Sequence, residues 1–170
     1  MKTIKWFIFL FCTTFLAFAQ QFETKTGGHE YTLEVPNYLK QTFDLNDVAT
    51  LQYKNISKDV YLIVIDDDKK ELESLEIDFP STTNFLLYFV KDYNIEAENR
   101  MQSEVVEFEN NGNTFSQVEL TFKDEASEYF MLITAVQTKT HFYKIMNWTK
   151  LVEKDLYYAD FKRIAKSLKD

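Results

Sequence analysis

The chain contains 170 residues, of which 27 are acidic and 19 are basic, and its formal net charge is −8 at pH 7. Such an acidic surface repels nucleic acid and anionic lipid headgroups, so we set both aside as partners. The single cysteine excludes an intramolecular disulfide. Abundant aromatic residues with few glycines and prolines are typical of a packed domain rather than a disordered tail.

Residues 1–19 have the pattern of a secretory signal peptide. Lys2 and Lys5 precede a short apolar run, and Ala17-Phe18-Ala19 places small residues at positions −3 and −1 of a cleavage point. The run is too short to span a bilayer comfortably, since a transmembrane helix needs about 20 apolar residues. We therefore expect cleavage after Ala19, export to a periplasm or out of the cell, no stable membrane span, and a single domain over 20–170.

Three strands are predicted in the first part of this domain. Segment 30–35 alternates polar and apolar residues up to a proline, and segment 48–53 alternates similarly. Segment 60–65 is continuously apolar, which predicts a strand covered on both faces. Residues 20–28 are polar and end in glycine, so we expect them to form a loose lead-in.

Two helices are predicted next. The first is short and covers 69–76, and the second begins after a run of good N-capping residues that starts at Ser81. Apolar residues then recur at three- and four-residue steps toward Glu98, which predicts one buried face. Leu87 and Tyr88 widen this apolar surface. Either the N-terminal segment buries them, which we favour, or they form an exposed patch for a partner or an apolar ligand.

A hairpin is predicted between strands over 101–109 and 114–122. The Asn-Gly pair at 111–112 is the strongest short hairpin signal, because both turn positions need a positive φ. With this pair at the centre of the turn, the register follows: Val105 faces Val118, Ser103 faces Leu120 and Met101 faces Phe122.

Two further strands and a helix are predicted to complete the chain. Segment 129–138 is apolar on both sides, as a central strand is, and segment 141–148 follows a tight turn. Tyr157, Phe161, Ile164 and Leu168 then mark an amphipathic helix. The order of elements predicts an α+β fold, with a central antiparallel sheet of about six to seven strands flanked by helices.

Several apolar residues have a familiar spacing. They are Tyr31-x-Leu33-x-Val35-Pro36, then Phe142-Tyr143, Trp148-Thr149 and Phe161…Ile164…Ser167. This pattern resembles the PsbP/Mog-type superfamily, which includes extrinsic photosystem proteins, a Ran-binding nuclear factor and many exported bacterial proteins. The resemblance implies an antiparallel sheet between helices. It supplies no catalytic residues, because members mostly bind other proteins and fold analogy does not determine function.

No catalytic motif is present, and we expect no catalytic residues and no cofactor. The chain has two histidines: His29 in the lead-in, and His141 at the start of a strand, where it shares a face with Tyr143. A histidine base needs a nucleophile within hydrogen-bonding reach, and the sequence indicates none. We expect His141 to pack or to hydrogen-bond locally.

The acidic run from Asp66 to Asp68 suggests two interpretations. Asp66 and Asp68 are candidate ligands for Ca²⁺ or Mg²⁺, with help from Glu71 or Glu73, although the residues that follow do not fit an EF-hand. We favour a solvated turn whose last aspartate caps the following helix and stabilises its positive end. No bound metal is therefore expected.

The predicted hairpin register also places Glu104 opposite Glu119, on the face away from its buried side. Directly opposed like charges are unfavourable, so we expect exposure to water, or a neighbouring lysine, to relieve them. Phe108 and Phe115 pair on the same face as these glutamates. Either a helix covers the two rings, which we favour, or they form a binding patch.

Three functions are compatible with these features. We favour an exported, non-enzymatic accessory domain that binds another protein of the cell envelope. The alternative is a carrier or sensor of a small apolar ligand held between the sheet and the helix from Ser81. The third is a carboxylate-dependent hydrolase, which requires Asp66, Asp68, Glu104, Glu119 or His141 to converge in one cleft. The sequence does not distinguish oligomeric states.

Overall fold

The computed structural model describes residues 21–170, so the predicted signal peptide and its cleavage point lie outside the described residues. The elements are β1 (Phe22–Gly27), β2 (Tyr31–Pro36), β3 (Lys40–Gln41), β4 (Leu51–Asn55), η1 (Ile56–Lys58), β5 (Val60–Asp68), α1 (Lys69–Ser74), α2 (Thr82–Val90), β6 (Glu98–Gln102), β7 (Val106–Asn110), β8 (Asn113–Asp124), β9 (Ser127–Gln137), β10 (His141–Lys150), η2 (Leu151–Glu153) and α3 (Lys154–Lys166).

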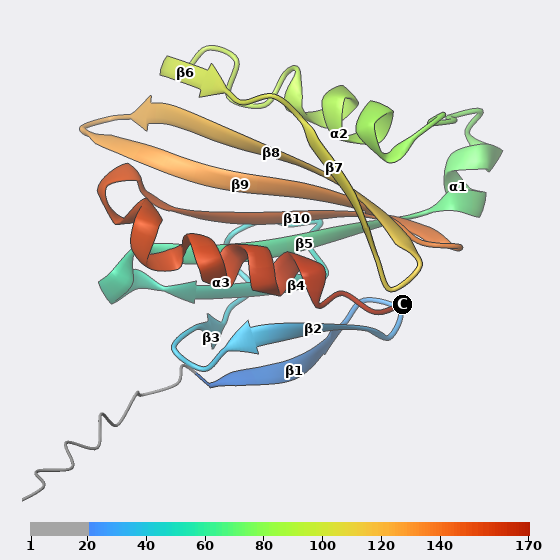
Figure 1. The fold of residues 1–170 in the computed structure, drawn as a ribbon, viewed down its shortest axis with the longest axis horizontal. Helices are drawn as coiled ribbons and strands as arrows, with labels where there is room; N and C mark the ends of the chain where they lie inside the picture. Colours follow the sequence, from blue (N-terminus) through green and yellow to red (C-terminus); the bar gives the residue numbers. More distant parts are fainter. Residues whose placement is uncertain (1–20) are drawn as a thin grey trace, which may run out of the picture.

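An eight-stranded sheet forms the centre of the molecule, and all its strand pairs are antiparallel. Its strands run in the order β3-β4-β5-β10-β9-β8-β6, and β7 also pairs with β8 (Figure 1). The predicted α+β class is confirmed. The predicted strand at 30–35 is not part of this sheet, because it pairs with β1 in a separate two-stranded sheet. The central sheet still has eight strands, because the two-residue β3 extends one edge and the segment before the hairpin forms both β6 and β7.

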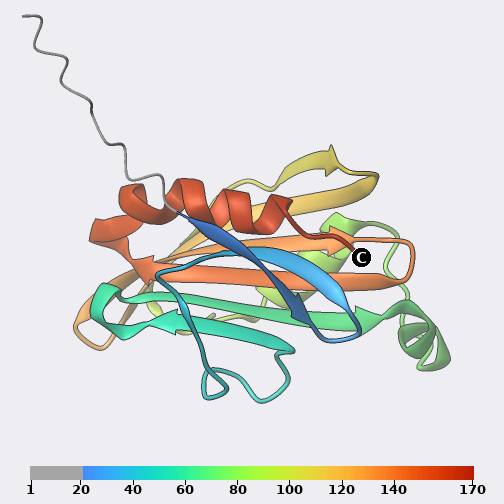
Figure 2. The same cartoon turned by 90° about the horizontal axis from the view of Figure 1, so that it is seen from below.

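Both faces of the sheet are covered. Helix α3 and the β1–β2 hairpin pack on one face, and α2 packs on the other (Figures 1 and 2). One apolar core lies between the sheet and α3 (the α3 core), and the other lies between the sheet and α2 (the α2 core). Successive side chains of β10 point into these two cores alternately, because side chains alternate along a strand. Tyr143 and Ile145 enter the α3 core, whereas Phe142 and Met146 enter the α2 core. Strand β5 also contributes side chains to both cores, which confirms the prediction that its continuous apolar run is covered on both faces.

The hairpin prediction is confirmed near the turn and wrong at its far end. Asn111 and Gly112 have φ values of 52° and 78°, and Phe108 faces Phe115 as the register requires. Residues 103–105 leave the pairing with β8, and β6 then pairs with β8 one residue away from the predicted register. Met101 faces Thr121 rather than Phe122, and its side chain is exposed. A one-residue shift of this kind turns every side chain to the other face.

Two expectations about local structure are corrected. The lead-in is not loose, because 22–27 form strand β1 paired along its whole length with β2. The predicted helix from Ser81 stops at Val90 rather than near Glu98, since Asn94 adopts a positive φ and the Arg100 side chain donates hydrogen bonds to the carbonyls of Val90 and Tyr93. Groups that satisfy the last carbonyls commonly end a helix.

Candidate functional site

Polar side chains gather where the end of β5 pairs with the start of β10. The register places Asp68 opposite His141 and Asp66 opposite Tyr143. Asp66 and Asp67 therefore belong to a strand and not to the expected solvated turn, because β10 supplies partners for the whole acidic run. The capping prediction is confirmed, since the Asp68 carboxylate accepts hydrogen bonds from the amides of Lys70 and Glu71.

Two distant parts of the chain complete this cluster. His29 lies in the turn between β1 and β2, with a positive φ on either side of it at Gly28 and Glu30. Asp170, the last residue of the sequence, is brought to the same place because Lys169 exchanges two backbone hydrogen bonds with Thr32. We call His29, Asp66, Asp68, His141 and Asp170 the histidine–aspartate cluster.

His29 is at the centre of the histidine–aspartate cluster. Its Nδ1 lies 3.1 Å from Asp66 Oδ2, and its Nε2 lies 3.0 Å from Asp170 Oδ1. The Tyr143 hydroxyl is also 3.0 Å from Nε2. The rings of His29 and His141 stack with their centroids 3.5 Å apart and their planes within 9°. His141 makes the expected local contact, 2.9 Å from Nδ1 to Thr140 Oγ1.

The charges in the cluster stabilise one another. Burial lowers the pKa of His29, but hydrogen bonds to Asp170 and Asp66 outweigh this effect and the net pKa is raised. Burial similarly opposes ionisation of Asp170, yet hydrogen bonds from Thr138, His29 and Thr140 lower its pKa to about 2. Burial and the nearby negative charges raise the pKa of Tyr143. This phenol therefore stays protonated, which is opposite to what a nucleophile requires.

The carboxylates proposed for a hydrolase do not all meet here. Asp66, Asp68 and His141 lie in the cluster, but Glu119 lies at α3, where its carboxylate is 2.6 Å from both Lys154 Nζ and the Tyr158 hydroxyl. Glu119 also stands opposite Ser103 and not Glu104, because its backbone amide and carbonyl both bond to Ser103. The expected opposition of two glutamates is therefore wrong, a consequence of the shifted register.

The four residues predicted as partner-binding candidates fall in two places. Phe115 is fully buried in the α3 core, and Phe108 is half-buried and stacks on it with centroids 4.9 Å apart. Leu87 and Tyr88 lie on the outer side of α2, with 39% and 62% of their surfaces exposed. The favoured prediction, that the N-terminal segment buries this pair, is therefore wrong, and the two side chains are accessible.

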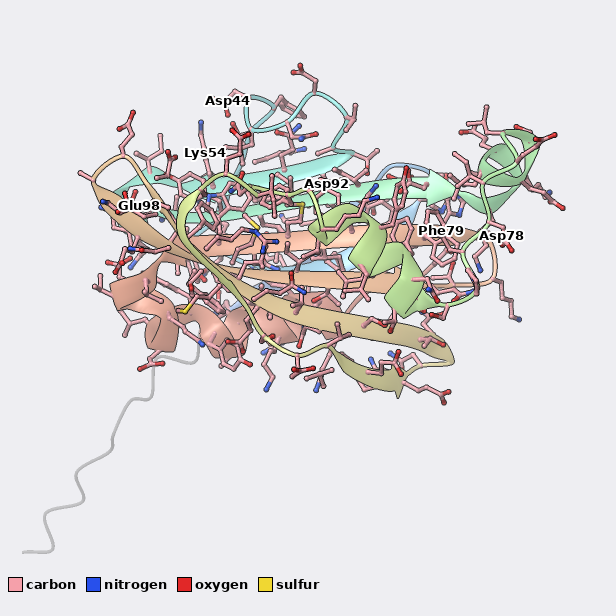
Figure 3. All side chains as sticks on the ribbon, turned by 90° about the horizontal axis from the view of Figure 1, so that it is seen from above. Asp44, Lys54, Asp78, Phe79, Asp92 and Glu98 are labelled. Atoms are coloured by element: carbon pink, nitrogen blue, oxygen red, sulfur yellow. The ribbon has the colours of Figure 1, made fainter. Side chains whose placement is uncertain are left out.

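An apolar groove lies between α1 and α2. Cavities of about 550 and 260 Å³ adjoin there and share Leu72, Ile77 and Phe79 in their walls. Phe79 contacts both Phe85 and Tyr88 of α2 edge-on, with centroids 5.1 and 5.4 Å away. Figure 3 shows Phe79 and Asp78 between the two helices. We call this feature the α1–α2 groove.

The rim of the α1–α2 groove is acidic. Glu73, Glu76 and Asp78 line it and are exposed, and none of the ion pairs within residues 21–170 involves them. The two lysines that line the groove are engaged: Lys144 Nζ lies 2.8 Å from Asp67, and Lys69 Nζ donates to the Thr138 carbonyl. Asp67 balances the charge of Lys144, and the three rim carboxylates outnumber the remaining cation of Lys69, so the net charge at the groove is negative.

The contact between α2 and the sheet is solid. Phe85, Leu86 and Val90 point into it and are 4%, 0% and 0% exposed. A ligand held between α2 and the sheet would need the space that these side chains fill, so the carrier hypothesis gains no support there. Within residues 21–170, no helix is long and apolar enough to cross a membrane.

No protein-family model and no curated protein matches the sequence. The fold, however, is similar to solved structures. Cyanobacterial PsbP (CyanoP) from Synechocystis sp. PCC 6803 aligns with a TM-score of 0.61 at 14% identity, over 91% of this chain and 94% of that one. The Saccharomyces cerevisiae Ran-binding protein Mog1p gives 0.58 at 10%, over 89% and 96%. LpqN, involved in cell envelope biogenesis of Mycobacterium tuberculosis, gives 0.57 at 10%, over 89% and 92%.

Proposed function

We propose that this chain, whose fold is that of the PsbP/Mog-type superfamily, is an exported, non-enzymatic accessory domain that binds another protein of the cell envelope through the α1–α2 groove. The single observation that carries the proposal is an apolar groove with three unpaired carboxylates on its rim. Interfaces commonly combine a desolvated apolar centre with a polar rim.

The charge of the rim identifies the kind of segment that fits. Glu73, Glu76 and Asp78 attract Lys and Arg side chains, whereas an acidic partner would be repelled. Phe79 and Tyr88 offer the aromatic surface on which an apolar anchor is buried, and aromatic residues are enriched at the energetic centres of interfaces. We therefore expect the partner to insert one apolar side chain flanked by basic residues.

Site-specific photo-crosslinking in the source cells tests this proposal. A photoreactive phenylalanine analogue at Tyr88 should crosslink to a peptide that carries Lys or Arg beside an apolar residue, identified by mass spectrometry. The same analogue at Val152, which is 89% exposed and lies outside the groove, is the control and should give no such adduct. Equal crosslinking at both positions, or an adduct lacking basic residues, would contradict the proposal.

A charge reversal makes the experiment specific to the rim. Replacing Glu73 and Asp78 together by lysine should reduce the Tyr88 adduct at least several-fold, and raising the salt concentration should reduce the wild-type adduct, because exposed charges are screened. Glu125→Lys is the matched control, since Glu125 is exposed in the β8–β9 turn. An adduct unaffected by the double reversal would remove the charge argument.

Export is supported by the pattern of residues 1–19 and is tested separately. Protein recovered from the envelope or the culture medium of the source cells should begin at Gln20 when its N-terminus is sequenced. An intact N-terminus on protein from the cytoplasm would overturn export, without affecting the groove.

A further inference from the structure

Both histidines direct one ring nitrogen toward the same carboxylate. Nε2 of His29 lies 3.0 Å from Asp170 Oδ1, and Nδ1 of His141 lies 3.8 Å from Asp170 Oδ2. One ligand atom from each of the three residues lies within 4.8 Å of the other two. The three residues come from the β1–β2 turn, from β10 and from the end of the chain, so only the fold brings them together.

Each histidine also has a carboxylate behind its other nitrogen. Asp66 Oδ2 lies 3.1 Å from Nδ1 of His29, and Asp68 Oδ2 lies 3.7 Å from Nε2 of His141. A histidine that ligates a metal almost always donates its remaining N–H to a carboxylate or a carbonyl, which fixes the tautomer and the direction of the ring. Asp66 is placed to do this for His29, whereas Asp68 would have to move closer to His141 to accept its N–H.

The third residue is also held in place. The Asp170 carboxylate accepts hydrogen bonds from the hydroxyls of Thr138 and Thr140, the second at 2.9 Å. The side chains of Asp170 and His141 are 14% and 10% exposed, whereas that of His29 is 33% exposed. His29 thus gives the cluster its access to solvent.

We infer that His29 Nε2, His141 Nδ1 and one oxygen of Asp170 bind a single divalent transition-metal ion of the Zn²⁺ class, with water as a fourth ligand. Tetrahedral Zn²⁺ with bonds of about 2.1 Å holds its ligand atoms about 3.4 Å apart. The 3.0 Å distance runs to Asp170 Oδ1 and the 3.8 Å distance to Asp170 Oδ2, so the carboxylate must turn to present one oxygen to both nitrogens. Two imidazoles and a carboxylate suit Zn²⁺, whereas Ca²⁺ and Mg²⁺ prefer oxygen ligands.

Binding requires local adjustments at both histidines, because Nδ1 of His141 must first leave the Thr140 hydroxyl, which lies 2.9 Å away. The two imidazole rings are parallel and stacked, so their nitrogen lone pairs do not yet converge on one point. The ring of His29, which lies in an exposed turn, must tilt away from that of His141 and give up its contact with the Tyr143 hydroxyl. In the metal-free cluster the His29 ring lies between the carboxylates of Asp66 and Asp170, and a metal at Nε2 would take the place of any proton on that nitrogen.

Nitrogen NMR of the purified, untagged protein tests the assignment directly. With only two histidines in the sequence, ¹⁵N-labelled histidine gives two ring systems to follow. One equivalent of Zn²⁺ should shift Nε2 of His29 and Nδ1 of His141, while Ca²⁺ and Mg²⁺ at the same concentration should shift neither. Unchanged histidine signals in the presence of Zn²⁺ would overturn the inference, and this readout needs no variant that has to fold.

Calorimetric titration with Zn²⁺ adds the contribution of each residue. His29→Gln should abolish the one-to-one binding, and Asp66→Asn should weaken it by about 10- to 100-fold, because it removes only the group that orients His29. Asp124→Asn is the matched control, since Asp124 is exposed at the far end of β8. Equal affinities for the wild type and His29→Gln would show adventitious binding and overturn the site. None of these outcomes depends on the α1–α2 groove.

Discussion

The two faces of the sheet differ in how completely they are closed. On the α3 face, buried aromatic rings are accompanied by polar contacts that join the helix to the sheet and to the hairpin, such as Glu119 with Lys154 and Ser167 with the amide of Glu34. On the α2 face, the buried side of the helix is equally tight, but its outer side continues into Tyr88, Ile77 and an acidic rim. The α3 face is closed by packing and polar contacts, whereas the α2 face leaves an exposed groove, which we propose binds a partner.

This contrast predicts that the largest loss of stability comes from the α3 face. Phe161 is fully buried and lies against Phe130 and Tyr157. Phe161→Ala should lower the free energy of unfolding by about 3–5 kcal/mol, because it removes a large apolar side chain and leaves a cavity. Denaturant unfolding followed by circular dichroism measures this change.

A matched control lies on the same helix. Leu156 is 71% exposed on the outer side of α3, so Leu156→Ala should change the free energy of unfolding by less than about 0.5 kcal/mol. Similar losses in the two variants would mean that α3 is not packed on the sheet as described.

The second prediction concerns the charged contact between sheet and α3. Burial opposes ionisation of Glu119, but hydrogen bonds from Lys154 and Tyr158 outweigh it and lower the pKa of Glu119. Glu119→Gln should cost about 1–2 kcal/mol of unfolding free energy at neutral pH. Because the folded pKa is depressed, this contribution is complete above the ordinary value of 4.5 and is lost as the pH falls through the folded pKa.

Acidification should therefore reduce the difference between wild type and Glu119→Gln. Urea unfolding at neutral pH and at a pH well below 4.5 measures it. Glu104→Gln is the control, because Glu104 is exposed and does not stand opposite Glu119. A difference that grows on acidification would contradict the lowered pKa.

The parts of the fold that the sequence predicted are those with local signals. The Asn111-Gly112 turn, the cap at Ser81 and the apolar run of β5 each depend on neighbouring residues, and all three are present in the structure. Strand β1 was missed because its polar sequence has no apolar face of its own. It is a strand because β2 offers it an edge to pair with.

The histidine–aspartate cluster could not be predicted for a related reason. His29 and Asp170 are separated by 141 positions, and no short-range pattern relates them. The acidic run at the end of β5 was a usable signal, but the sequence predicted a turn there. A strand that continues through three aspartates was unexpected, because isolated carboxylates disfavour strands. Here Lys144 pairs with Asp67, and His29 lies beside Asp66.

The third prediction tests whether helix α2 opens independently of helix α3. Ser81 caps α2, and its hydroxyl accepts a hydrogen bond from the amide of Asn84 at 3.1 Å. Ser81→Ala should cost about 1 kcal/mol. Amide hydrogen exchange should show faster opening at the start of α2 and no change in α3. Ser81→Asp, which preserves a capping oxygen, should restore most of the loss, whereas equal exchange in both helices would mean that they unfold as one unit.

The smallest effect on stability is expected at Tyr88, and it is the most informative about function. The ring is 62% exposed, its contacts are Phe79 edge-on and the Lys91 ammonium 4.7 Å above it, and neither lies in the core. Tyr88→Ala should change the free energy of unfolding by less than about 0.5 kcal/mol. If the α2 face serves recognition, the same substitution should greatly weaken partner capture through a photoreactive group placed at Ile77, on the opposite wall of the groove. If Tyr88→Ala instead lowered the free energy of unfolding and left partner capture unchanged, the proposal would be contradicted. Tyr88 would then contribute to packing and not to recognition.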